Sequence, residues 1–188
     1  MLLLALSLEL SAPLRAMETT VNGVAFGGVF PNPLCESRAL RSESGAEVQL
    51  GLRIFNRTGR PLRFSDYDTI LPELVNRAGA VVPFAFGINP ARLPRAADYP
   101  LLPPGRFLVL PLEATLMLRT GQLEWHGSDG AAGYWNVVRA EAPYRLRLHY
   151  RQTDAVVGPL EKEDSTLHGL WIGEATTKSV EVPLGLFD

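Results

Sequence analysis

Hydrophobic and polar residues alternate along several stretches of this chain, most clearly in residues 48–64. The first half of that stretch is apolar at every second position: Val48, Leu50, Leu52 and Ile54. A period of two places one face of an extended strand in a core. Residues 56–61, which include Asn, Gly and Pro, then interrupt the alternation. Because these residue types favour turns, the pattern predicts a tight reversal and a second strand at residues 62–64.

Two later stretches, residues 107–119 and 144–151, alternate in the same way. The first has an apolar face formed by Leu108, Leu110, Leu112, Ala114, Leu116 and Leu118. The second places tyrosines and leucines on one face and, on the other, Arg145, Arg147, His149 and Arg151. Both predict strands. Pro111 lies inside the first of them, and because proline cannot donate to a ladder, we expect a bulge or an edge position there.

Shorter patterns supply the remaining expected strands. Residues 70–75 and 80–86 flank a turn at residues 76–79 and predict a hairpin. Each of these two strands contains a proline, Pro72 or Pro83, which indicates edge or bulged strands. Further strands are expected at residues 1–12, 122–125, 170–172 and 178–184, the last two as a pair.

Three long connections separate these strands, and we expect them to form loops or insertions. They comprise residues 13–46, 87–105 and 152–169, of which the first holds one short strand at residues 24–26. Long ordered loops often carry function in proteins built on rigid sheets.

Composition supports an all-β fold. The chain has 188 residues, with 17 glycines and 15 prolines distributed along it and no long helical pattern between them. Residues 1–188 suit one domain. We therefore expect a single antiparallel β-sandwich of immunoglobulin or fibronectin-III type, with about seven to nine strands and long loops.

Charge and cysteine content narrow the expected partners. The net charge is −2, from 18 basic and 20 acidic residues, so binding to nucleic acid is not expected. Cys35 is the one cysteine, which rules out an intrachain disulfide and suits a structural thiol. The leucine-rich start lacks a preceding basic residue and contains Glu9, so it predicts a strand, no transmembrane segment and a cytoplasmic protein. If that stretch is instead a signal, the protein is exported.

A family resemblance rests on the order of several turn motifs between about residues 48 and 150. Their residues are Asn56, Leu62-Arg63-Phe64-Ser65, Tyr67-Asp68, Asn76 to Gly79, Leu102-Pro103-Pro104-Gly105 and Ala142-Pro143-Tyr144. In this order and spacing the chain resembles the intracellular proteinase inhibitor family of bacterial Ig-like domains. The resemblance implies an Ig-like fold and names one possible activity, inhibition of a proteinase through an exposed loop such as residues 87–105.

Two further observations accompany this resemblance. The segment from Trp171 to Thr177 is similar to a W-x-G-x-x-x-T ending in uncharacterised bacterial proteins with the same pattern. Tyr144 stands where a sandwich places a tyrosine corner, in which the phenol bonds to backbone upstream.

Catalytic and metal-binding patterns are sparse. His126, His149 and His168 stand far apart in the sequence, without further ligand-type residues at the spacing of a zinc motif, so we expect neither a metal nor another cofactor. Ser128 beside His126 suggests a hydrolytic enzyme as one alternative. No nucleophile elbow accompanies the two residues, and a flexible glycine-rich turn explains them better.

The candidate binding residues are arginines. A shared sheet for residues 62–64 and 144–151 would gather five of them on one outer face: Arg60, Arg63, Arg145, Arg147 and Arg151. Such a face suits an anionic protein partner, although solubilising charge on an exposed sheet is the simpler explanation of it. The sequence thus favours a non-enzymatic Ig-like protein-binding module or an accessory subunit of a larger assembly. The alternatives are a proteinase inhibitor and a hydrolytic enzyme.

Overall fold

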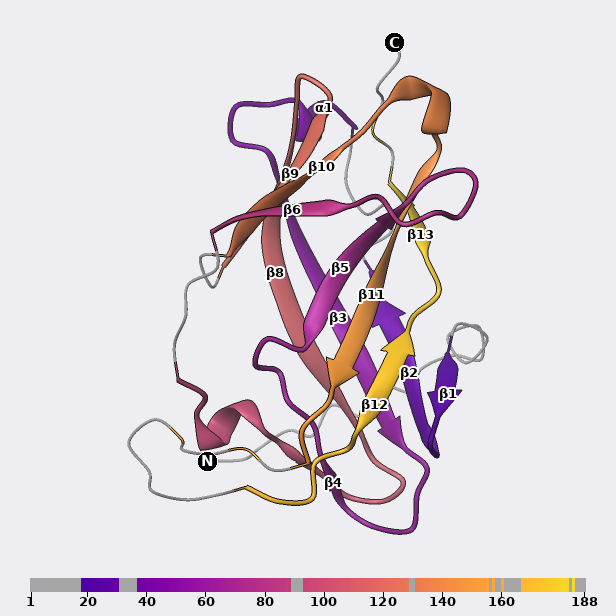
Figure 1. The fold of residues 1–188 in the computed structure, drawn as a ribbon, viewed down its shortest axis with the longest axis vertical. Helices are drawn as coiled ribbons and strands as arrows, with labels where there is room; N and C mark the ends of the chain where they lie inside the picture. Colours follow the sequence, from indigo (N-terminus) through magenta and orange to yellow (C-terminus); the bar gives the residue numbers. More distant parts are fainter. Residues whose placement is uncertain are drawn as a thin grey trace, which may run out of the picture.

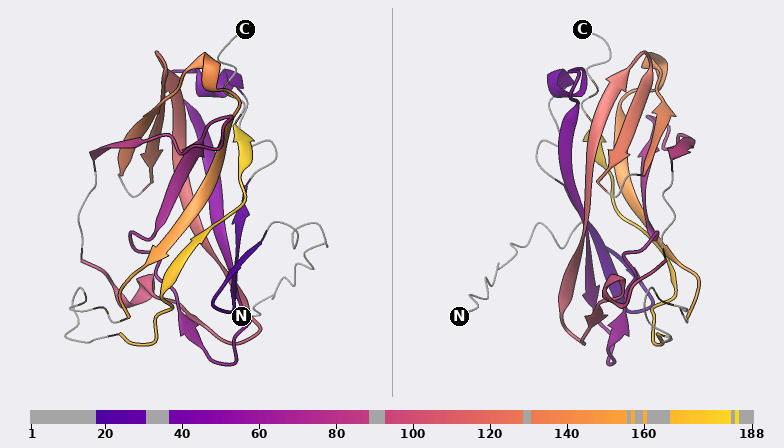
Figure 2. Two further views of the ribbon diagram at one scale, coloured as in Figure 1. Left: turned by 45° about the vertical axis from the view of Figure 1, so that its right-hand side comes forward. Right: turned by 90° about the vertical axis from the view of Figure 1, so that its left-hand side faces the viewer.

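The chain folds into antiparallel β-sheets that stack in two layers (Figures 1 and 2). The computed structural model describes residues 18–30, 37–88, 93–128, 131–155, 157, 160, 167–182 and 184. Within these ranges the helical elements are short: α1 (Ser37–Leu40) and the 3₁₀ turns η2 (Ala96–Asp98) and η3 (Arg139–Glu141). The described strands form several sheets, none of which closes on itself, so the all-β prediction is confirmed.

The larger sheet has seven strands. In spatial order these are β1 (Thr19–Val21), β2 (Val24–Val29), β3 (Ala46–Asn56), β8 (Phe107–Arg119), β9 (Gln122–Gly127), β10 (Ala132–Asn136) and β6 (Phe84–Ile88). β8 covers the range that the alternation predicts. Its Pro111 lies opposite Gly51 of β3, while β9 pairs with β8 only from Ala114 onward, so the expected edge position at this proline is confirmed.

The second layer is a four-stranded sheet centred on β11 (Tyr144–Gln152). β5 (Ile70–Val75) pairs along one side of β11, whereas β12 (Gly173–Thr176) and β13 (Val180–Val182) follow one another along the other side. Thr177 joins them, since its backbone N–H donates to Leu148 O at 2.9 Å. The predicted pair of residues 170–172 and 178–184 is therefore wrong: residues 170–172 form no strand, Leu170 makes only an isolated bridge to Arg63, and β13 pairs with β11.

The predicted hairpin at residues 48–64 is also wrong in its pairing. β3 forms as expected, but it pairs with β2 and β8, and β4 (Leu62–Arg63) pairs instead with β7 (Leu101–Leu102). Alternation shows that a segment is extended and half-buried, but it does not name the neighbouring strand. The turn after β3 thus carries the chain out of the large sheet.

Buried Asn56 holds that turn in place. Its Nδ2 donates to Arg60 O and to Leu102 O, both at 2.9 Å, and its Oδ1 accepts from Thr58 N at 2.9 Å. The side chain is fully buried, and these bonds use both of its polar atoms. One asparagine therefore fixes the exit from β3 and ties it to the end of β7.

Residues 13–46 contribute more to the fold than the single short strand expected. Within the described part of that range, β1 and β2 form a hairpin around Asn22 and Gly23, whose φ angles are 49° and 76°. β2 then pairs with β3 over six residues and places Val24 and Phe26 in the core. The expected first strand at residues 1–12 and the thiol of Cys35 lie outside the described residues.

The predicted hairpin at residues 70–86 begins and then divides between the two layers. Asn76 N donates to Ala80 O at 3.0 Å, and Val75 bridges to Val81. Beyond this turn β6 leaves β5 and pairs with β10 in the large sheet. β5 itself is an edge strand, as its proline indicates.

A shared aromatic core joins the two layers. Phe26 of β2 stacks on Tyr150 of β11 with ring centroids 5.6 Å apart, and Trp171 lies 4.9 Å from Phe26. Phe64 completes this buried cluster. The predicted tyrosine interaction is confirmed as well: Val138 N donates to the Tyr144 hydroxyl at 2.7 Å, and that hydroxyl donates to Val138 O at 3.0 Å.

Candidate functional site

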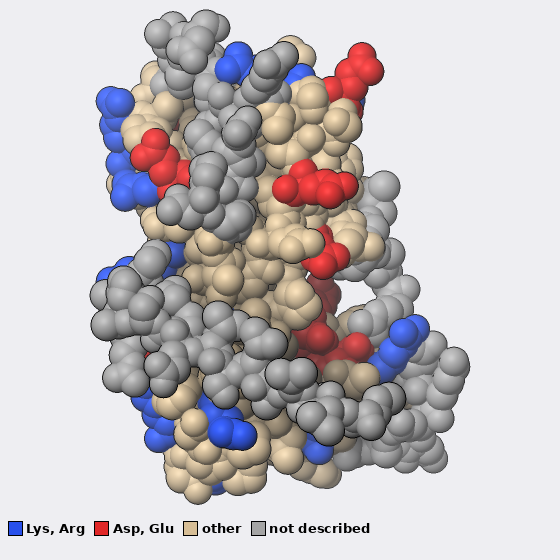
Figure 3. All heavy atoms as spheres, turned by 180° about the vertical axis from the view of Figure 1, so that it is seen from behind, with Lys and Arg blue, Asp and Glu red and all other residues tan. Residues whose placement is uncertain are grey.

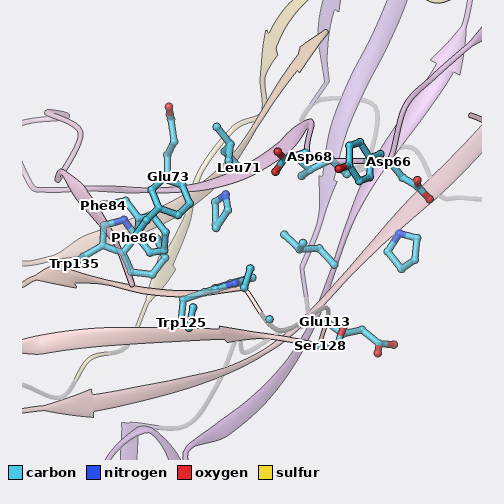
Figure 4. Close-up of a pocket in the computed structure, with 18 of the residues that line it drawn as sticks. Asp66, Asp68, Leu71, Glu73, Phe84, Phe86, Glu113, Trp125, Ser128 and Trp135 are labelled. Atoms are coloured by element: carbon cyan, nitrogen blue, oxygen red, sulfur yellow. The ribbon is translucent and has the colours of Figure 1, made fainter. Parts of the chain in front are cut away.

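A pocket of about 550 Å³ opens between the two layers, at the point where β9 separates from β8. We call it the acidic pocket. Its described lining includes five carboxylic acids: Asp66, Asp68, Glu73, Asp98 and Glu113. It also includes four aromatic rings of the large sheet: Phe84, Phe86, Trp125 and Trp135. Figure 4 shows Asp66, Asp68 and Glu113 on one side of this pocket and Phe84, Phe86 and Trp135 on the other.

The acidic end is built where the chain continues beyond the β4–β7 pair. Phe64 N donates to Pro100 O at 3.2 Å and Asp66 N donates to Asp98 O at 2.9 Å, so these two segments run side by side. Asp98 is buried, and its Oδ2 accepts from Arg95 N at 2.7 Å. The short ribbon thus brings Asp66 and Asp98 together at the pocket wall.

The aromatic end depends on a glycine. Gly133 of β10 lies opposite Trp125 of β9, and a Cβ atom at Gly133 would approach the ring of Phe84 to 2.5 Å. Without that atom, the Phe84 ring lies 4.7 Å from Trp135, and Trp135 meets Trp125 edge-on at 6.3 Å. Gly133 therefore allows three rings from three strands to pack together.

One polar atom at this end has no partner. Trp135 is fully buried, and its Nε1–H finds no acceptor among the described residues. Most buried polar groups are hydrogen-bonded, because leaving a donor unpaired costs free energy. The indole N–H of Trp135 is therefore an unsatisfied donor enclosed by protein atoms behind the pocket wall.

Charge in the pocket is strongly one-sided. Its described lining residues include no lysine or arginine, although the whole chain is close to neutral. Figure 3 shows several acidic side chains around a hollow at one edge of the molecule, with basic atoms beside one of them. Burial raises the pKa of the Tyr99 hydroxyl, and the nearby carboxylates of Asp98 and Asp66 raise that pKa further. The field at this edge therefore favours positive charge.

The five carboxylates differ in how far their charge is compensated. Glu73 accepts from Arg147 Nε at 2.8 Å. Asp68 and Glu113 are exposed, and their side-chain carboxylates make no hydrogen bond or ion pair with the described residues. In the described part of the chain, no three Asp, Glu, His or Cys side chains converge closely enough to hold a metal ion. The acidic residues thus surround the pocket instead of meeting at one point.

The predicted arginine face is only partly assembled. Arg145, Arg147 and Arg151 project from β11, each beside an acidic residue of a neighbouring strand. Arg151 Nε lies 3.0 Å from Glu174 Oε1, and Arg145 lies opposite Glu181 in the strand register. Two of the three arginines are ion-paired and the third lies across the sheet from a glutamate, so this surface has no excess of basic charge.

The other two predicted arginines do not join that row, because β4 and β11 belong to different sheets. Arg63 turns to the β4–β7 ribbon, where its Nη1 donates to Tyr99 O at 2.9 Å. Arg60 is exposed in the turn after β3. The assumption of a common sheet for residues 62–64 and 144–151 is therefore corrected.

The residues of the two alternative activities lie in different places. Ser128 lines the acidic pocket, but His126 does not, and its Nε2 lies 3.1 Å from Glu124 Oε2. The two side chains therefore do not converge in this pocket. Of the loop suggested for proteinase inhibition, residues 89–92 lie outside the described part of the chain, and the rest contains η2 and β7.

Of the residues that line the pocket, the sequence pointed only to Ser128, as part of the alternative hydrolytic site. The pair Tyr67-Asp68 was noted only as a turn motif. One available signal was the run Asp66-Tyr67-Asp68, two acids in a turn beside a core strand. The aromatic rings come from β6, β9 and β10, and only the strand order brings them together.

No protein-family model, curated protein or solved structure matches this chain. The resemblance to the bacterial proteinase inhibitors therefore stays a prediction. The described residues contain no helix that is long and apolar enough to cross a bilayer.

Proposed function

We propose that this chain is a non-enzymatic binding domain that recognises its partner through the acidic pocket. The observation that supports the proposal is the composition of that pocket: a cavity of about 550 Å³ in which exposed carboxylates face a wall of aromatic rings. Ligand sites in proteins are typically concave and mostly apolar, with a few polar groups and a volume of about 300 to 1,000 Å³.

The rim of the pocket favours a partner with apolar surface, such as a protein. Among the residues that line it, Leu71, Val81 and Phe86 leave 37%, 47% and 61% of their surface exposed. Exposed apolar area bordered by charge is typical of interaction sites. By contrast, the paired charges of the β11 arginines offer little free energy to a partner, since exposed ion pairs contribute about 0 to 1 kcal/mol.

The fold we propose for this domain is an immunoglobulin-like sandwich. Two antiparallel layers with a common core and the Tyr144 interaction with Val138 support it. The seven-stranded sheet is larger than the sheets of a simple seven-strand domain of this class, so the proposed fold is an enlarged version.

Ser128→Arg tests whether the pocket is the binding site. Ser128 is exposed and lines the acidic end, so an arginine there should fill and neutralise the pocket without disturbing the core. Ser44→Arg, in the exposed loop between α1 and β3, is the matched control. Each variant is titrated with three probes of one shape: 2-(4-methoxyphenyl)ethylammonium, the corresponding neutral alcohol, and 3-(4-methoxyphenyl)propionate.

Intrinsic tryptophan fluorescence reports binding, because two of the chain's three tryptophans, Trp125 and Trp135, line the pocket. We expect saturable binding of at least one probe to the wild type and to Ser44→Arg, and at least tenfold weaker binding to Ser128→Arg. If no probe binds the wild type, or if Ser128→Arg binds as the wild type does, the proposed function is wrong.

A further inference from the structure

The two ends of the acidic pocket differ in chemistry, and the difference identifies the class of ligand. We infer that the group that enters the pocket is an organic ammonium ion with an apolar body, either a free aromatic amine or a lysine side chain beside an apolar residue. This inference rests on the proposed function, and it adds the charge and shape of the ligand.

The acidic end supplies charge that the protein leaves uncompensated. Glu73 is paired with Arg147, and the Asp98 carboxylate accepts a backbone N–H. Asp68 and Glu113 have no such partner among the described residues, and Figure 4 shows both on the side away from the aromatic rings. A cation between them would gain attraction from both, whereas an anion would be repelled.

The aromatic end suits the body of the same ligand. Phe84, Phe86 and Trp135 form a continuous ring cluster, in which Phe84 and Phe86 meet edge-on at 4.7 Å. Ring faces attract cations and bury apolar groups, which favours an ammonium ion attached to an apolar body over a strongly hydrated inorganic cation.

The arrangement of the carboxylates argues against a metal ion as the ligand. Divalent cations need several oxygen ligands that converge within about 2 to 2.6 Å of one point. In the described part of the chain no group of three metal-ligating side chains is placed in this way. An ammonium ion on a larger molecule accepts charges distributed around a rim, because hydrogen bonds and longer-range attraction both contribute to its binding.

The probe series of the preceding section tests the charge requirement, since its members share one shape and a methoxy acceptor. We expect the ammonium probe to bind at least about tenfold more tightly than the alcohol, and the carboxylate to bind most weakly. The preference should shrink between about 0.05 and 0.5 M salt, because added ions screen exposed charges.

Substitutions at the acidic and the aromatic ends of the pocket test which residues cause the preference for the ammonium probe. The double variant Asp68→Asn, Glu113→Gln should reduce the preference for the ammonium probe over the alcohol to about twofold or less. Glu181→Gln removes a carboxylate from β13, outside the pocket, and should leave the preference unchanged. Phe86→Ser should weaken the binding of the ammonium and the alcohol probes by the same factor. Because Phe86 is exposed, the fold should tolerate this substitution.

A further experiment with peptides tests whether the ammonium group comes from a protein lysine or from a free small molecule. A capped tetrapeptide with adjacent phenylalanine and lysine is compared with its glutamine version. Lysine-dependent peptide binding that is lost in the double variant would support a protein partner, and binding of the free amine alone would support a small molecule. Equal binding of ammonium and alcohol probes would overturn this inference while the proposed function stands, whereas no binding of any probe overturns the proposed function itself.

Discussion

Tyr150 connects the two layers of the molecule at the scale of single atoms. Its ring stacks on Phe26 of the opposite sheet, and its buried hydroxyl accepts a hydrogen bond from Ser65 N at 3.0 Å. Burial raises the pKa of this hydroxyl well above its ordinary value near 10, an effect that the hydrogen bond to Ser65 only partly offsets. Folding therefore favours the neutral phenol.

Alkaline pH should weaken the fold through this residue. Below about pH 10 the phenol is neutral in both states, and its contribution to stability is fully present. Above that pH the unfolded chain loses the proton first, so the free energy of unfolding falls by up to about 1.4 kcal/mol per pH unit until the folded pKa is reached. Urea titrations of the wild type and Tyr150→Phe between pH 8 and 11 measure this slope.

The Tyr150→Phe variant separates two effects. It should be less stable at pH 8 by about 1 to 3 kcal/mol, because Ser65 N loses its acceptor in the core. Above pH 10 the free energy of unfolding of this variant should fall less steeply than that of the wild type. The remaining pH dependence reflects Tyr99 and Tyr144, whose pKa values burial also raises. Parallel declines in the two proteins would show that Tyr150 does not carry the effect.

At the scale of elements, sequence alternation identified strands better than their partners. β8 and β11 occur where leucines and tyrosines recur at every second position, because one face of each strand lies in the core. The partners of β3 and β6 were mistaken, since two strands that are adjacent in the sequence pair in different layers here. The acidic pocket was missed for the same reason, as its walls come from strands that only the strand order brings together.

A local signal for one missed element was nonetheless present. Asn22-Gly23 is a strong two-residue hairpin signal, because both residues tolerate positive φ and the twist of the resulting turn matches that of the strands. It marks the β1–β2 hairpin within residues 13–46. Turn residues inside a long connection therefore deserve as much weight as the apolar pattern around them.

Gly23→Ala tests the importance of that turn. Gly23 has φ of +76°, and a Cβ atom there would lie 2.9 Å from Thr58 Cγ2. The variant should lose about 1 to 2 kcal/mol of stability in urea unfolding, from backbone strain and this close contact. Gly59→Ala is the matched control: no atom lies within 4 Å of its added Cβ, so we expect a change within about 0.5 kcal/mol. Equal effects at the two glycines would contradict the role of the turn.

At the scale of the whole molecule, one core serves both layers. Most buried apolar residues of the seven-stranded and four-stranded sheets belong to a single cluster, from Val24 and Phe26 of β2 to Leu146 and Tyr150 of β11. A smaller cluster of Tyr99, Leu160 and Leu170 lies apart from it. Because neither large sheet has a second apolar core in the described residues, we expect the two layers to unfold together.

Phe26→Ala tests this unity. Phe26 is fully buried and contacts Phe64, Tyr150 and Trp171, so removing its ring should cost about 3 to 5 kcal/mol. Phe107→Ala, with half of its side chain exposed on β8, should cost about 1 kcal/mol or less. Urea unfolding is followed by far-ultraviolet circular dichroism for the strands and by tryptophan fluorescence for the core.

In Phe26→Ala the two signals should change together and at a lower urea midpoint than in the wild type, because the lost contacts join both layers. Two separate transitions in the wild type would show instead that each layer has a stability of its own.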